Sequence, residues 1–71
     1  MLNSYKIIYT KQCIVNLKTG IAFKGYFYKS NKNIIVLKNS YIIENGRDPI
    51  EVSGEVILDK SNIDFIQIIN S

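Results

Sequence analysis

The sequence predicts an all-β protein, a small and strongly bent antiparallel barrel of five strands. Hydrophobic side chains alternate with polar ones at a period of two over most of the chain, which is typical of half-buried strands. A glycine, Gly25, interrupts the most regular of these stretches, and Asn45-Gly46, a strong hairpin signal, separates two extended runs. No segment has a convincing helical period.

The first two strands are expected at residues 13–18 and 21–28, with Thr19-Gly20 as the turn between them. The first strand has three residues on one side: Cys13, Val15 and Leu17. The second has two faces: Ile21, Phe23 and Phe27 on one, and Ala22, Lys24, Tyr26 and Tyr28 on the other. Because glycine weakens a flat strand, Gly25 indicates a sharp bend of the kind that a small barrel needs.

Three further strands complete the predicted barrel. A long strand is expected at residues 33–44, a return strand at 47–59 and a short final strand at 62–69. Pro49 has no N–H group to donate to a neighbouring strand, so it is expected at the start of the return strand or at an edge.

The N-terminal segment is the remaining part of the chain. Tyrosine and isoleucine alternate in it as in a strand, and one turn of helix is the competing interpretation; we favour an extended segment. The expected organisation is one domain over residues 1–71, with an N-terminal extension at 1–11 and the barrel at 12–69.

Size and composition favour self-assembly. A chain of 71 residues is near the lower limit for unaided folding, and disulfides, metals or oligomerisation are the usual additional sources of stability. Cys13 is the only cysteine and there is no histidine, so neither an internal disulfide nor a zinc site is expected. Oligomerisation is the remaining source of additional stability. Small barrels often have open strand edges, through which subunits can pair.

The composition also argues against an enzyme. Without histidine, a glycine-rich phosphate loop or paired carboxylates, we expect no catalytic residue, no metal and no cofactor. The net charge of +3 permits a polyanionic partner without requiring one. The sequence has no signal-peptide stretch and no membrane-spanning run, which favours a cytoplasmic protein without membrane contact.

Two stretches contain spaced residues of a known family. The stretch VNLKTGIAFKGYFYKSNKNIIVLKN supplies, without a gap, Leu17, Gly20, Ile21, Phe23, Gly25, Phe27 and Leu37-Lys38-Asn39. This pattern resembles the first motif of the Sm/Lsm family, with the closest similarity to the bacterial RNA chaperone Hfq. GEVILDKSNIDFIQI resembles the second motif, and the resemblance covers roughly residues 13–69. Divergent phage-encoded Sm-like proteins are a reasonable comparison.

The resemblance implies a homo-oligomeric ring of five to seven subunits, in which the fourth strand of one subunit pairs with the fifth strand of the next. In this family the loops after the second and fourth strands meet around a pore that binds U-rich RNA. In this chain those loops are KSNKN at residues 29–33 and DKSN at 59–62, so the tripeptide Lys-Ser-Asn occurs in both.

These two loops supply the candidate residues for binding single-stranded nucleic acid, RNA in preference to DNA. The candidates are Lys29, Asn31, Lys32, Asn33, Lys60, Ser61 and Asn62. Lysine side chains would contact phosphates, and asparagine and serine would hydrogen-bond to base edges. Ordinary turn chemistry is the alternative explanation of the repeated tripeptide.

Several of the family's RNA contacts are replaced in this chain. Asp59 stands where the second motif has a base-stacking arginine, Asn33 where Hfq has a stacking aromatic, and Ser61 where Hfq has a histidine. A ring that serves as a structural or protein-interaction module without binding RNA is therefore the alternative function.

A second candidate surface consists of Lys24, Tyr26 and Tyr28. Tyrosines flanked by lysines are typical of proteins that stack the bases of single strands. The competing interpretation, which we favour from the sequence, is that both tyrosines cover the second face of the barrel or a contact between subunits.

Overall fold

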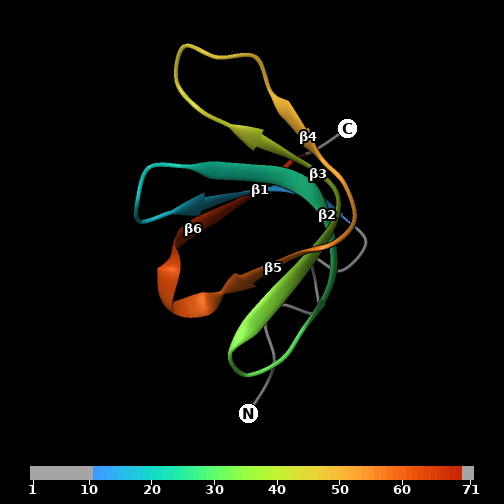
Figure 1. Ribbon diagram of the computed structural model, residues 1–71. Coiled ribbons are helices and arrows are strands. Elements are labelled where there is room, and N and C mark those ends of the chain that lie inside the picture. Colours follow the sequence, from blue (N-terminus) through green and yellow to red (C-terminus); the bar gives the residue numbers. More distant parts are fainter. Residues whose placement is uncertain (1–10, 70–71) are drawn as a thin grey trace.

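Six β-strands and a short 3-10 helix follow one another in the computed structural model, which describes residues 11–69 (Figure 1). They are β1 (Gln12–Leu17), β2 (Ala22–Ser30), β3 (Ile34–Ile43), β4 (Ile50–Val52), β5 (Val56–Asp59), the helix η2 (Lys60–Asn62) and β6 (Ile63–Ile68). The extended segment expected in the N-terminal extension falls on residues 1–10, outside the described residues. No helix in the described part is long and apolar enough to cross a membrane.

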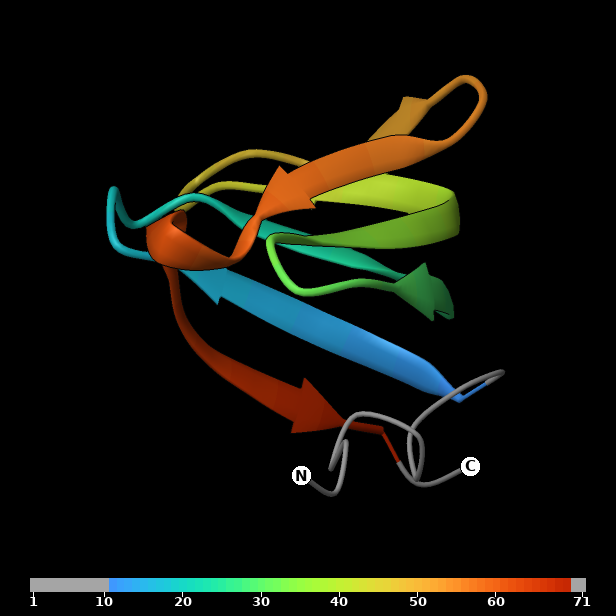
Figure 2. The same cartoon turned by 90° about the horizontal axis from the view of Figure 1, so that it is seen from below.

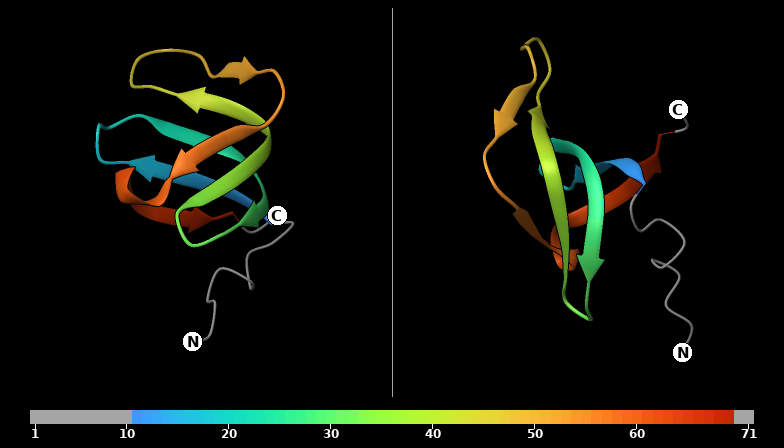
Figure 3. Two further views of the ribbon diagram at one scale, coloured as in Figure 1. Left: turned by 60° about the horizontal axis from the view of Figure 1, so that its bottom comes forward. Right: turned by 90° about the vertical axis from the view of Figure 1, so that its right-hand side faces the viewer.

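All strand pairs are antiparallel, and the order in the sheet is β4-β3-β2-β1-β6, with β5 also paired to β3. The sheet curls on itself, with β4 and β5 along one border and β6 along the other (Figure 3). The predicted all-β class and the bent antiparallel barrel are therefore confirmed.

The prediction of one continuous return strand at residues 47–59 was wrong. The segment forms β4 and β5, which pair with different halves of β3, and residues 53–55 between them belong to neither strand. Gly54 lies in this break with a φ of +82°, a left-handed conformation that ends regular strand pairing. The helix η2 was also not expected; it occupies most of the loop expected at residues 59–62.

The bend predicted at Gly25 is confirmed. The pairing of β2 with β3 shifts register between Lys24 and Tyr26, so Gly25 occupies the irregular position. A Cβ atom at Gly25 would lie 2.7 Å from Ser40 Oγ and 3.0 Å from the carbonyl oxygen of Lys38, so only glycine allows the two strands to approach this closely.

The core lies inside the curled sheet. It consists of Cys13, Val15, Phe27, Ile35, Leu37 and Leu58. The inward side chains expected in β1 are confirmed, but in β2 the core face starts at Phe23, because Ile21 precedes the strand and is 38% exposed. Burial raises the pKa of the Cys13 thiol to about 11, so this thiol is protonated at neutral pH.

The turn at Asn45-Gly46 is also present. The backbone N–H of Arg47 donates to the carbonyl oxygen of Glu44 at 3.3 Å, and Gly46 has the positive φ that such a turn requires. It is not a tight two-residue hairpin, because β3 ends at Ile43 and β4 begins only at Ile50. Pro49 lies directly before β4, at the start of a strand as predicted.

Candidate nucleic-acid interface

The two Lys-Ser-Asn segments lie side by side at one end of the barrel. The backbone N–H of Lys60 donates to the carbonyl oxygen of Asn33 at 2.8 Å, and Asp59 pairs with Ile34. Figure 2 shows the turn after β2 next to η2. We call this part, residues 29–33 and 59–62, the Lys-Ser-Asn end.

The first segment contains ordinary turn chemistry. Asn31 Oδ1 accepts hydrogen bonds from the backbone N–H groups of Asn33 at 2.8 Å and Ile34 at 3.0 Å. This side-chain-to-backbone pattern is typical of asparagine in turns. The amide oxygen of Asn31, a sequence candidate for reading bases, therefore serves the loop itself.

The second segment has a different conformation. Lys60, Ser61 and Asn62 form η2, and the carbonyl oxygen of Asn62 accepts a hydrogen bond from the N–H of Lys18 at 2.8 Å. The same tripeptide thus has two backbone conformations, which places its two lysines and its two asparagines in different local settings.

The structure brings all seven sequence candidates to the Lys-Ser-Asn end. Lys60 is half-buried, and the other six are exposed: Lys29, Asn31, Lys32, Asn33, Ser61 and Asn62. Asp59 is exposed next to them and carries the opposite charge. The end carries three ammonium groups that suit phosphate and one carboxylate that opposes them.

The second candidate surface lies on the outer face of β2 and β3. Tyr26 and Tyr28 are 44% and 41% exposed. The Nζ atom of Lys38 lies 3.7 Å from the centroid of the Tyr28 ring, and that of Lys29 lies 5.3 Å from it, both within the range of cation–π attraction. We call Tyr26, Tyr28, Lys29 and Lys38 the tyrosine face.

Sequence reasoning missed Lys38 as a member of this face. Lys38 pairs with Tyr26 across the β2–β3 ladder, but two register shifts in that ladder change which residues lie opposite each other. The sequence shows the two tyrosines on one face of the predicted strand. Identifying Lys38 as the cross-strand partner of Tyr26 requires the register between β2 and β3. Lys24, the third sequence candidate, is half-buried and pairs with Tyr41.

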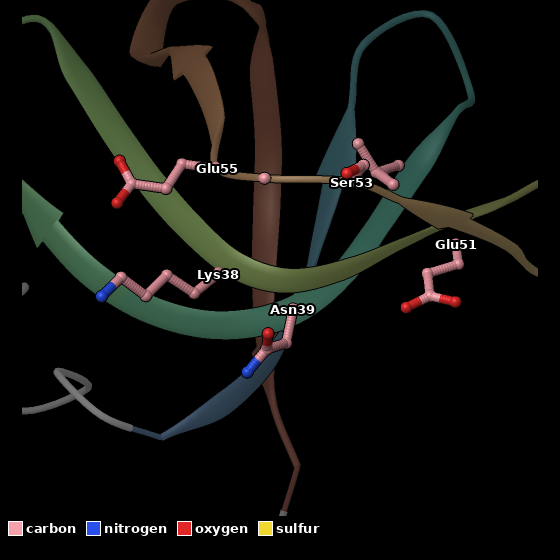
Figure 4. Close-up of a pocket in the computed structure, with 7 residues that line it drawn as sticks. Lys38, Asn39, Glu51, Ser53 and Glu55 are labelled. Carbon is pink, nitrogen blue, oxygen red and sulfur yellow. The ribbon is translucent and has the colours of Figure 1, made fainter.

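A hollow of about 340 Å³ borders the tyrosine face. Glu51 and Glu55 lie on either side of it, with Lys38 and Asn39 contributed by the bent strand β3 (Figure 4). Asn39 has a φ of +51°, a conformation that asparagine tolerates better than most residues. Two carboxylates make this hollow a poor site for phosphate.

Three strands have an unused hydrogen-bonding side among the described strands. β4 and β5 each pair only with β3, and β6 pairs only with β1. Because Lys60 N–H bonds to Asn33, strand alternation directs the N–H groups of Ile57 and Asp59 away from β3. Large apolar side chains are exposed on β5 and β6, with Ile57 65% and Phe65 52% exposed.

Comparison with known proteins gives a result only at the level of structure. No protein-family model and no curated protein matches the chain. A heptameric archaeal Sm protein superposes on it with a TM-score of 0.83 at 18% identity, covering 94% of this chain and 97% of that protein. The chain has the Sm fold. The Sm-like fold expected from the motif spacing is thus confirmed.

Two further structures agree. The SmAP1 heptamer of P. aerophilum has a TM-score of 0.83 at 18% identity, covering 96% of this chain and 90% of that one. The Sm protein of Pyrococcus abyssii, solved in complex with a uridine heptamer, has a TM-score of 0.80 at 21% identity and covers 96% of this chain and all of that one. The nearer similarity to Hfq stays a prediction.

Proposed function

We propose that the chain is a non-enzymatic, cytoplasmic Sm-fold protein that forms a homo-oligomeric ring of five to seven subunits and binds single-stranded RNA in preference to DNA. The observation that carries this proposal is the hydrogen bond between Lys60 N–H and Asn33, which holds two lysine-bearing turns together at one end of the barrel. Ring closure would then gather one such end from every subunit.

Two features support assembly through strand edges. The outward N–H groups of β5 and the open side of β6 are complementary backbone arrays, and pairing them between neighbours would extend the sheet from one subunit to the next. The same pairing would cover exposed apolar side chains such as Ile57 and Phe65. Two of the structurally similar Sm proteins are heptamers.

Phosphate contacts would dominate RNA binding. Lys29 and Lys32 are exposed at the Lys-Ser-Asn end, and repetition around a ring would multiply their charge. Asn33, Ser61 and Asn62 are exposed and can donate to and accept from base edges, which would add a weak base preference. One of the structurally similar proteins was solved with a uridine heptamer bound.

A ring without RNA binding is the second candidate. Asp59 favours it, because each subunit would add one exposed carboxylate beside the lysines and would repel phosphate. Asn31 also favours it, because its oxygen is engaged in its own turn.

Replacing Lys32 with glutamine is expected to weaken binding of a short oligo-U about tenfold at low salt, because one phosphate contact is lost in every subunit that the RNA reaches. Arg47→Gln is the matched control: it removes the same charge from the exposed β3–β4 turn, away from the Lys-Ser-Asn end. Fluorescence anisotropy titrations between about 50 and 200 mM salt measure both variants.

The wild-type affinity should fall steeply with salt, and the slope should be shallower for Lys32→Gln than for Arg47→Gln. If neither oligo-U nor oligo-A binds at low salt, RNA binding is contradicted, and the second candidate, a ring that does not bind RNA, is supported. A wild-type affinity that does not change with salt would contradict the phosphate mechanism.

A further inference from the structure

The outer edge of β4 stays open even when subunits assemble through β5 and β6. Among the described strands β4 pairs only with β3, and Gly54, with its left-handed φ of +82°, separates β4 from β5. Because the break at residues 53–55 interrupts the edge, a neighbouring strand that pairs with β5 does not continue along β4. Alternate N–H and carbonyl groups of β4 therefore face away from β3, and such an edge can receive another strand.

The hairpin that contains β4 carries most of the negative charge of the chain. Residues 44–55 hold four of the six carboxylates, Glu44, Asp48, Glu51 and Glu55, and one cation, Arg47. This stretch therefore carries a charge of −3 and the remaining residues carry +6, which together give the net charge of +3. We call residues 44–55 the acidic arm; its loop between β3 and β4 projects from the barrel (Figure 1).

β4 has an apolar face and an acidic face. Val52 lies opposite the fully buried Ser40, so Val52 and Ile50 share the face that adjoins the core, although Ile50 is 48% exposed. Glu51 lies on the other face, opposite Tyr41, which is 39% exposed. A strand added to this edge would place every second side chain beside the apolar residues and the others beside the carboxylate.

We propose that the open edge of β4 binds an extended segment of another protein, in which basic residues alternate with apolar ones. Backbone hydrogen bonds would extend the sheet, and the apolar side chains would cover Ile50. The basic side chains would meet Glu51 and, across the hollow of about 340 Å³, Glu55. Lys38 also borders the hollow, but its Nζ atom lies 3.7 Å from the centroid of the Tyr28 ring.

Two occupants from this chain itself fit the edge less well. A second copy of β4 would bring its own acidic arm beside the first, and the like charges would repel each other. The N-terminal segment joins the described residues at Lys11, whose carbonyl oxygen accepts a hydrogen bond from the N–H of Phe27 in β2 at 3.0 Å. Because β3 lies between β2 and β4, this segment would have to cross β3 to reach the edge.

The test uses a fluorescent seven-residue peptide in which lysine alternates with valine, titrated by anisotropy at low salt. The double variant Glu51→Gln/Glu55→Gln is expected to bind it about tenfold more weakly, because two charge-assisted contacts are lost. Asp59→Asn/Asp64→Asn removes two exposed carboxylates outside the acidic arm and should bind within about twofold of wild type.

Two control peptides separate strand pairing from charge. A peptide in which proline replaces each valine keeps the charge but loses half of its N–H groups, and it should bind at least tenfold more weakly. A peptide in which glutamate replaces each lysine keeps the β-branched residues and should not bind, because its carboxylates would meet those of the arm.

Amide hydrogen exchange followed by NMR locates the added strand. Exchange at residues 50–52 should be fast in the free protein and at least tenfold slower with the lysine–valine peptide bound. The proposal is overturned if wild type does not bind this peptide, if the double variant or the proline peptide binds as tightly, or if protection appears only on β5 or β6. Slow exchange of all β4 amides in the free protein would also overturn it, because a segment of this chain or a second copy would then cover the edge.

Discussion

Replacing Ile57 with proline is expected to convert the assembly into monomers of 8.1 kDa that remain folded. Ile57 lies in the middle of β5, with its N–H directed away from β3, so proline removes no hydrogen bond within the subunit. Its side chain is 65% exposed, so little core packing is lost. A neighbouring strand, however, would lose a hydrogen bond and meet the proline ring.

Light scattering after size exclusion measures this change. Wild type should have five to seven times the subunit mass, and Ile57→Val, which keeps the N–H and an apolar side chain, should behave like wild type. Circular dichroism checks that the proline variant retains its β-structure. A proline variant that keeps the full assembly mass would show that subunits do not meet through β5.

Replacing Gly25 with alanine is expected to lower the free energy of unfolding by about 3 kcal/mol, near the upper end of the usual cost of overpacking. The added Cβ would meet Ser40 Oγ at 2.7 Å and the backbone oxygen of Lys38 at 3.0 Å. The contact with the Ser40 hydroxyl can be removed by substituting Ser40, but the carbonyl oxygen of Lys38 can move away only if β2 and β3 separate. Urea denaturation at a fixed subunit concentration measures the loss.

Ser40→Ala provides the matched test of this explanation. Ser40 is fully buried, and its hydroxyl has no hydrogen-bond partner among the described residues, so its removal alone should be tolerated. In the double variant Gly25→Ala/Ser40→Ala, about half of the alanine penalty should be recovered, because the contact with the Lys38 oxygen persists. Additive effects of the two substitutions would contradict a direct contact.

Much of this fold follows from local patterns. Alternation in residues 13–18 indicates a strand with Cys13 and Val15 inward, and both are fully buried. Gly25 indicates a bend because glycine weakens a flat strand, and the close approach of Ser40 explains why no larger residue fits there. Such features depend on one strand and its two faces, which the sequence displays directly.

Features that depend on two strands at once could not be predicted in the same way. The break at Gly54 sits inside a regular alternation, so the pattern at residues 47–59 looks continuous. The contact of Lys38 with Tyr28 depends on register shifts between β2 and β3. At the Lys-Ser-Asn end, the family resemblance and the repeated tripeptide identified the candidates, but the use of the Asn31 oxygen within its own turn required the loop geometry.

Native mass spectrometry of the protein with a short oligo-U tests most directly whether neighbouring subunits share one binding site. We expect five to seven subunits of 8.1 kDa bound to a single oligonucleotide, because the Lys-Ser-Asn ends would converge on one axis. Monomers, or complexes with one oligonucleotide for each subunit, would contradict the shared site.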